Sequence, residues 1–254
     1  MDTRAWGPSG WQLLHLIAHD YPSNANGMTR RRYEIFFNTI KDILPCKFCR
    51  ESTTQFMQEL DLHTAMKNNH TLSKWMYDIH NRVNKKLRDQ CKEDPRIICP
   101  DDDPEFSKVQ KKYTELLEIQ PNAPPGMDFL FCIAFNYPKD ITSDKVQIYF
   151  DFFMNLYDIF PYANLRKIYQ NHVDHHIIYN ALQSRDKLIR WLYSIMYAMS
   201  IETNSDYLPT LRGTYQRYGY YMSGCKRGKT CRNGKKIRDH KKTYKVTHAR
   251  LIKL

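Results

Sequence analysis

The sequence predicts an all-α protein in which one helical domain is followed by a second, degenerate helical domain. Three observations support this prediction. Glycine is scarce, at 9 of 254 residues. Apolar residues recur at helical spacing in several stretches, and few runs alternate polar and apolar residues as strands do. With 42% hydrophobic residues, the chain can also bury a substantial core.

Four helical patterns occupy the first part of the chain. The first has apolar or aromatic residues at i, i+3, i+4 and i+7. A proline then ends the second pattern and is well placed to begin the third, which carries a Cys-x-x-Cys pair. In chain order the patterns cover residues 11–18, 33–44, the segment after Pro45, and residues 72–87.

The first pattern returns after a linker. Acidic and proline-rich segments, 100–105 and 120–126, enclose a charged stretch with helical character. Beyond it, a shift of 116 residues superposes paired motifs without a gap, and such a repeat indicates a duplicated helical domain. The superposed motifs are Tyr21-Pro22 with Tyr137-Pro138, Phe36-Phe37 with Phe152-Phe153, and Trp75-x-Tyr77 with Trp191-x-Tyr193. The predicted boundaries are 1–100 for the first domain, 101–122 for a linker or connecting helix, 123–211 for the second copy and 212–254 for a basic tail.

The second copy keeps the apolar framework and loses the polar and redox positions. Cys46 and Cys49 correspond to Tyr162 and Leu165, and His15 corresponds to Phe131. We therefore expect chemistry in the first copy alone.

The Cys46-x-x-Cys49 pair is the first candidate site. A helix N-terminus stabilises a thiolate, and this spacing lets the two sulfurs close a small, reducible disulfide. Half of a zinc site, completed by Cys91 and Cys99, is the alternative, although the distances along the chain differ from compact zinc motifs.

Four sequence motifs together resemble the Erv/ALR family of FAD-dependent sulfhydryl oxidases over about residues 4–92. They are WGPSGWQLLH (6–15), Tyr21-Pro22, PCKFCR (45–50) and WMYDIHNRVNKKL (75–87). The resemblance implies a four-helix bundle that holds FAD beside the disulfide, and no catalytic metal. The cofactor-binding residues it implies are Trp6, Gly7, Trp11, His15, Cys49, His80, Asn81, Val83, Asn84, Lys86 and Leu87.

The resemblance also implies an activity. Cys49 is the sulfur next to the flavin, and Cys46 is the outer sulfur that a substrate thiolate attacks. Electrons from thiol-bearing proteins or small dithiols pass through the pair and the flavin to O2, which yields H2O2. This chain departs from many family members in two places. Tyr77 replaces a cysteine that pairs with one after the helix, and Arg88-Asp89 stands where a lysine is common.

The tail carries most of the positive charge. From residue 212 to the end there are 14 Lys and Arg against one acid, whereas the rest of the chain is nearly neutral. Cys225 and Cys231 in this tail are possible shuttle cysteines, or zinc ligands with His240 and His248. The charge also suits weak nucleic-acid contact, with tyrosines available to stack on bases: Tyr215, Tyr218, Tyr220, Tyr221 and Tyr244.

The second copy suggests either an intrachain pseudo-dimer or a separate binding domain, and the resemblance also allows a homodimer. The sequence shows no membrane-spanning segment and no signal peptide. Together with the resemblance, this predicts a viral protein that acts in the host cytoplasm, in the virus factory or in the virion. The competing function is a zinc-containing nucleic-acid-binding protein.

Overall fold

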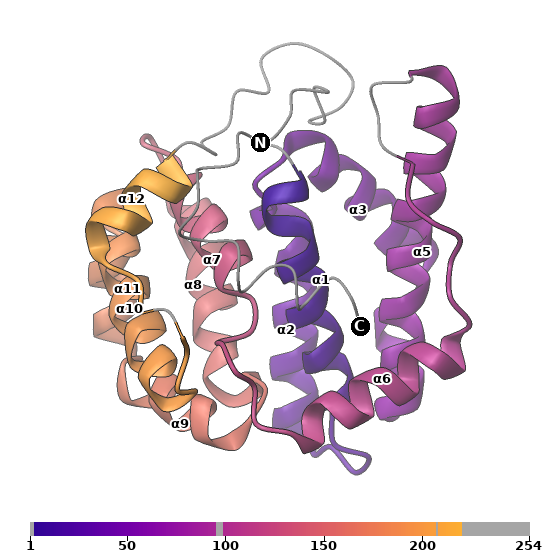
Figure 1. Ribbon diagram of the computed structural model, residues 1–254, viewed down its shortest axis with the longest axis horizontal. Coiled ribbons are helices and arrows are strands. Elements are labelled where there is room, and N and C mark those ends of the chain that lie inside the picture. The colour runs from indigo at the N-terminus through magenta and orange to yellow at the C-terminus, as the bar shows by residue number, and fades with distance from the viewer. Residues whose placement is uncertain (1–2, 95–98, 207, 220–254) are drawn as a thin grey trace.

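The computed structural model describes residues 3–94, 99–206 and 208–219, and in these residues all regular secondary structure is helical (Figure 1). The all-α prediction is therefore confirmed. No helix in the described ranges is long and apolar enough to cross a membrane. The helices are α1 (Thr3–His19), α2 (Gly27–Ile43), α3 (Lys47–Glu59), α4 (Leu62–Ala65), α5 (Asn69–Glu93), α6 (Phe106–Glu118), α7 (Met127–Phe135), α8 (Ser143–Ile159), α9 (Ala163–Asn171), α10 (His175–Ala181), α11 (Arg185–Glu202) and α12 (Leu211–Gly219).

Local signals explain where the main helices of the first copy begin. The Asn26 side chain accepts a bond from the Thr29 amide at 2.8 Å and caps α2. Asn68 and Thr71 form a reciprocal capping box, so α5 starts at Asn69, before the predicted residue 72. The helix also continues to Glu93, beyond the predicted end at residue 87.

The second copy repeats this framework at the same interval of 116 residues. Helix α8 has the bounds of α2 shifted by 116. Tyr21 donates to the Met66 carbonyl at 2.9 Å, and its counterpart Tyr137 donates to the carbonyl of Leu182, the counterpart of Met66, at 2.6 Å. These repeated contacts support the proposed duplication.

The repeat is incomplete at α7. The counterpart of α7 is α1, which begins at Thr3, whereas α7 begins only at Met127 and is shorter. Pro124 and Pro125 precede it, and Gly126 adopts a left-handed conformation with φ of 77°. Pro8, the counterpart of Pro124, lies inside α1, so the difference in α7 comes from the second proline, Pro125, and from the left-handed Gly126, which interrupts a helical backbone.

The two copies share one hydrophobic core, in which α2 packs on α8 and α1 packs on α7. The rings of Phe36 and Phe152, counterparts at the 116-residue interval, stack with centroids 5.2 Å apart. Gly10 faces Phe129, and in reciprocal fashion Gly126 faces Leu13. Such reciprocal contacts are those of a two-fold, isologous interface.

Ion pairs also connect the copies. Arg32 on α2 pairs with Asp158 on α8. Asp20, directly after α1, pairs with Arg166 on α9 at 2.5 Å.

Helix α12 lies within the segment predicted to begin the basic tail. Tyr218 is 3% exposed, stacks on Phe131 with ring centroids 4.8 Å apart, and donates to the Asp128 carboxylate at 2.6 Å. Tyr215 donates to Asp186. These two tyrosines are therefore part of the second copy, and the expectation that Tyr218 is available for base stacking is wrong. Cys225, Cys231 and the remaining tail tyrosines lie outside the described residues.

Candidate functional site

The redox pair lies at the N-terminus of α3. Cys46 is the N-cap residue, in an extended conformation, and its sulfur accepts a bond from the Cys49 amide at 3.3 Å. Pro45 precedes the cap and Arg50 donates to the Leu44 carbonyl at 2.6 Å, which fixes the turn between α2 and α3. The structure holds both cysteines as thiols.

The two thiols differ in acidity and exposure. A hydrogen bond from the Cys49 thiol lowers the pKa of Cys46 to about 7. The same contact, together with burial, raises the pKa of Cys49, and the nearby Lys86 ammonium opposes that rise. Cys46 is 1% exposed, whereas Cys49 is half-buried, so the outer position expected for Cys46 is not apparent in this conformation.

Lys86 connects α5 to the redox helix. Its ammonium group donates to the Ser52 hydroxyl of α3 and lies close enough to influence the pKa of Cys49. The helical spacing puts Lys86 one turn from Val83, which packs against the core. Lys86 of α5 therefore lies beside the redox helix, close to Cys49.

Rings from α1 and α5 form a second cluster. Trp11 and His80 stack face to face, with centroids 3.9 Å apart and planes 13° apart. His15 Nε2 lies 3.1 Å from His80 Nδ1. Flat rings of this kind suit contacts with a heteroaromatic cofactor.

Two imidazole nitrogens in this cluster are buried without a hydrogen-bond partner among the described residues. They are His15 Nδ1 and, one turn further along α1, His19 Nε2. Desolvation lowers the pKa of both imidazoles, and it lowers that of His80 to about 4. Buried polar atoms normally have partners, so neutral imidazoles left unpaired here fit a site that receives a polar ligand. Gly7 on the same helix leaves room beside it, since a Cβ there would meet no atom within 4 Å.

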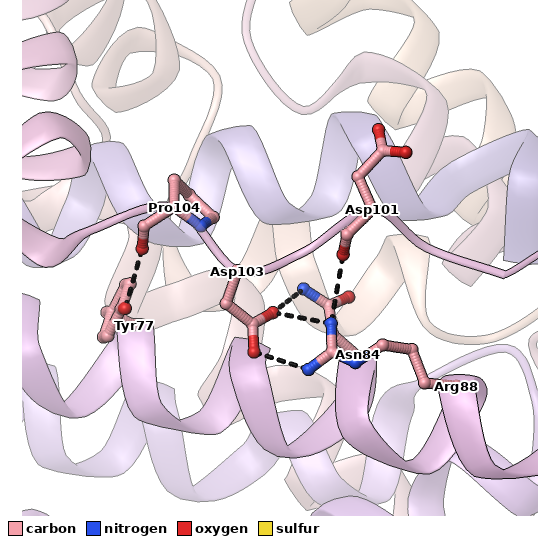
Figure 2. Close-up of polar contacts among 6 residues, drawn as sticks. All are labelled: Tyr77, Asn84, Arg88, Asp101, Asp103 and Pro104. Atoms are coloured by element: carbon pink, nitrogen blue, oxygen red, sulfur yellow. Dashed lines mark hydrogen bonds and ion pairs between the residues drawn. The ribbon is translucent and has the colours of Figure 1, made fainter.

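The connecting segment contributes residues that the sequence did not single out. Tyr113 of α6 is 8% exposed and stacks on His15 with centroids 4.8 Å apart. Asp103 accepts bonds from Asn84 at 3.0 Å and from Arg88 at 2.6 Å, as Figure 2 shows. An apolar stripe at Phe106, Val109, Tyr113 and Leu117 was a sequence signal for a packed helix here.

Other expected site residues have different neighbours. Trp6 packs against Phe129 of the second copy, with ring centroids 5.7 Å apart. Asn81 lines a surface hollow of about 390 Å³ together with Arg82, Lys85 and Arg88. Leu87 is half-buried on α5.

The further ligands of the zinc alternative are bonded to each other. Cys91, near the end of α5, and Cys99 form a disulfide with their Cα atoms 5.5 Å apart. The described residues contain no group of three or more His, Cys, Asp or Glu side chains arranged to hold a metal.

Comparison with known proteins agrees with the motifs. The profile of the Erv1 / Alr family matches residues 8–103. The relatives whose names contain FAD-linked sulfhydryl oxidase include three from two viruses and a yeast. They are R368 of Acanthamoeba polyphaga mimivirus, 35% identical over 33% of this chain and 59% of its own length; ERV1 of Saccharomyces cerevisiae, a mitochondrial protein, 32% identical over 34% and 45%; and 347L of Invertebrate iridescent virus 6, 30% identical over 34% and 83%.

The family profile matches the first copy, and the chain spans about half the length of the first two relatives. It spans most of the iridescent-virus protein at 30% identity, in addition to matching the family profile. By its sequence and its helical fold, this chain belongs to the Erv1 / Alr family.

Proposed function

We propose that this protein is an FAD-dependent sulfhydryl oxidase that forms disulfides in proteins or small dithiols, with O2 as electron acceptor and H2O2 as product. The observation that carries the proposal is the Cys46–Cys49 pair at a helix N-terminus, one of whose thiols is acidified to a pKa of about 7. The names of the relatives support the same activity.

The aromatic cluster fits the cofactor that those names imply. Trp11, His15 and His80 provide flat contacts, and the two unpaired imidazole nitrogens provide polar ones. We assign Val83, Asn84, Lys86 and Leu87 to the α5 wall of the site, Gly7 to the α1 wall, and Trp6 and Asn81 to its edges. Tyr113 joins this set through its contact with His15. FAD held by these residues would supply a two-electron acceptor for the dithiol that can be reoxidised by oxygen.

The cysteines carry out two thiol–disulfide exchanges. In the oxidised protein, a substrate thiolate attacks the Cys46 sulfur, which forms a mixed disulfide and releases Cys49 as a thiolate. The second substrate thiolate then attacks the substrate sulfur of that mixed disulfide. This step forms the substrate disulfide and releases Cys46 as a thiolate. The lowered pKa of Cys46 favours this departure, and Lys86 stabilises the negative charge at Cys49. Because Cys46 is 1% exposed, the residues around it must move before a substrate thiolate can reach its sulfur.

The second copy acts in this proposal as an intrachain partner. The reciprocal contacts of Gly10 with Phe129 and of Gly126 with Leu13 support a pseudo-dimer within one chain. The viral relatives support a viral role, in the host cytoplasm, the virus factory or the virion.

The test is the visible spectrum of the purified protein before and after dithiothreitol is added in air. A flavin band should bleach with the dithiol and return with oxygen. The band should remain in Cys49→Ala but no longer bleach at the wild-type rate. Cys132→Ala, which changes a cysteine of the second copy, should behave like the wild type. A colourless protein that cannot take up FAD contradicts the proposal.

A further inference from the structure

In the second copy, the residue that replaces the redox cysteine Cys46 makes a hydrogen bond to α6. Tyr162, the counterpart of Cys46, donates a hydrogen bond from its hydroxyl to the Leu116 carbonyl of α6 at 2.9 Å. Leu116 lies three residues from Tyr113, whose ring stacks on His15 in the first copy. We propose that Tyr162 and Arg166 are positioning residues, through which the second copy holds α6 against the cofactor site. This inference rests on the proposed function.

The backbone at Tyr162 supports a specific role. Its φ is 66°, whereas Cys46 at the equivalent place has a φ of −117°. Residues with a Cβ rarely adopt a positive φ, and such conformations persist where surrounding contacts enforce them, often at functional positions. Burial and the nearby Asp20 raise the pKa of Tyr162 to about 12, so the hydroxyl remains a donor at alkaline pH as well. The second copy thus has a strained residue at the position where the first copy has Cys46, the N-cap residue of α3.

Arg166 adds a second connection from the same turn. Like its counterpart Arg50, it donates to a carbonyl six residues earlier, here that of Phe160 at 2.7 Å. In addition, its Nη2 pairs with Asp20, which follows His19 at the end of α1. The first turn of α9 therefore holds both the end of α6 and the end of the helix that carries His15 and His19.

The other end of α6 is attached to the first copy itself. Figure 1 shows α6 crossing the end of the first bundle from α5, and Figure 2 shows the segment before it bound along α5. Tyr77 donates to the Pro104 carbonyl at 2.8 Å, and Asp103 binds Arg88 and Asn84. Tyr113 lies between the two attachments, 5.1 Å from the His19 ring by centroids. Loosening either attachment should therefore loosen Tyr113.

The decisive measurement is backbone amide hydrogen exchange of α6 in the full-length, flavin-free Tyr162→Phe variant. The substitution keeps the ring and removes the hydrogen bond to Leu116, so the amides of α6 should exchange roughly 2- to 10-fold faster while those of α11 stay unchanged. Tyr179→Phe, which alters an exposed tyrosine of the same copy, is the matched control and should leave α6 unchanged. Unchanged α6 exchange in Tyr162→Phe overturns the inference.

Two further readouts separate positioning from general stability. FAD should leave Tyr162→Phe roughly 2- to 10-fold faster, as measured by the fluorescence of released flavin. Tyr162→Gly relieves the strained φ but also removes a ring that packs against the core, so the thermal midpoint should fall by less than loss of the ring alone would cause, while α6 still exchanges faster. FAD release at the wild-type rate, or release that changes only in proportion to the thermal midpoint, refutes a positioning role. If the wild type takes up no FAD, the proposed function fails, while the exchange of α6 still decides whether the second copy holds that helix.

Discussion

The stacked pair at the centre of the interface between the copies gives the sharpest stability prediction. Phe36 has 0% exposure, stacks on Phe152 and meets Phe37 edge-on with centroids 5.3 Å apart. Phe36→Ala removes a fully buried ring, and such changes lower the free energy of unfolding by about 3–5 kcal/mol. For a fold of this size that corresponds to a fall of roughly 6–20 °C in the thermal midpoint.

The assay is guanidinium unfolding followed by far-ultraviolet circular dichroism. Because one core spans both copies, Phe36→Ala should shift a single transition, and Phe152→Ala should shift it by a similar amount. The double variant should lose about 0.5–1.5 kcal/mol less than the sum, because the stacking interaction is lost only once. Ile119→Ala, at a 58% exposed site, is the control and should change stability by no more than about 0.5 kcal/mol. Two separate transitions, with only one responding to Phe36→Ala, would refute the reasoning.

Three further predictions concern the site and the backbone. In the flavin-free, reduced protein, alkylation of Cys46 by iodoacetamide should rise with a midpoint near pH 7, and Cys49→Ala should move that midpoint upward because the donor thiol is lost. Burial holds the pKa of His15 below its unfolded value of 6.5, so acid protonates the unfolded chain first and stability falls as the pH drops below about 6.5. His15→Phe, which copies the second domain, should weaken that dependence in thermal melts between pH 7.5 and pH 5 while His19 and His80 retain part of it, and an unchanged slope would contradict the reasoning. Gly126→Ala combines a φ of 77° with a Cβ 2.5 Å from Leu13, so it should cost about 2–5 kcal/mol in denaturant unfolding, whereas no measurable cost would argue against this packing.

The sequence predicted the framework well where local signals and burial agree. The 116-residue interval predicted that α8 corresponds to α2, because the paired aromatics at 36–37 and 152–153 occupy equivalent buried positions in the two helices. It did not predict the late start of α7, where Pro125 and the left-handed Gly126 override an apolar pattern that otherwise matches α1. It also missed α12, because nine residues of a strongly basic segment give little sign that Tyr218 has a buried acceptor in Asp128.

The candidate site was predictable only in part. Helical spacing and motif resemblance brought Trp11, His15 and His80 together, and the structure places them in contact. The contribution of Tyr113 could not be foreseen, since it depends on a connecting helix folding back across α1. Contacts between segments this far apart in the sequence are determined by tertiary packing, which local patterns do not encode.

The Arg32–Asp158 ion pair shows that two copies within one chain can diverge from each other in sequence. In a homodimer every substitution appears on both sides of the two-fold axis, whereas in one chain each side can change alone. At the mirror-related position the residues are Ile148 and Asp42, and they line a hollow of about 440 Å³ between α2 and α8. Because the two halves are tethered, their association is a first-order event whose equilibrium is independent of protein concentration. The chain should therefore keep its paired architecture at dilutions where a bimolecular assembly of the same halves would dissociate.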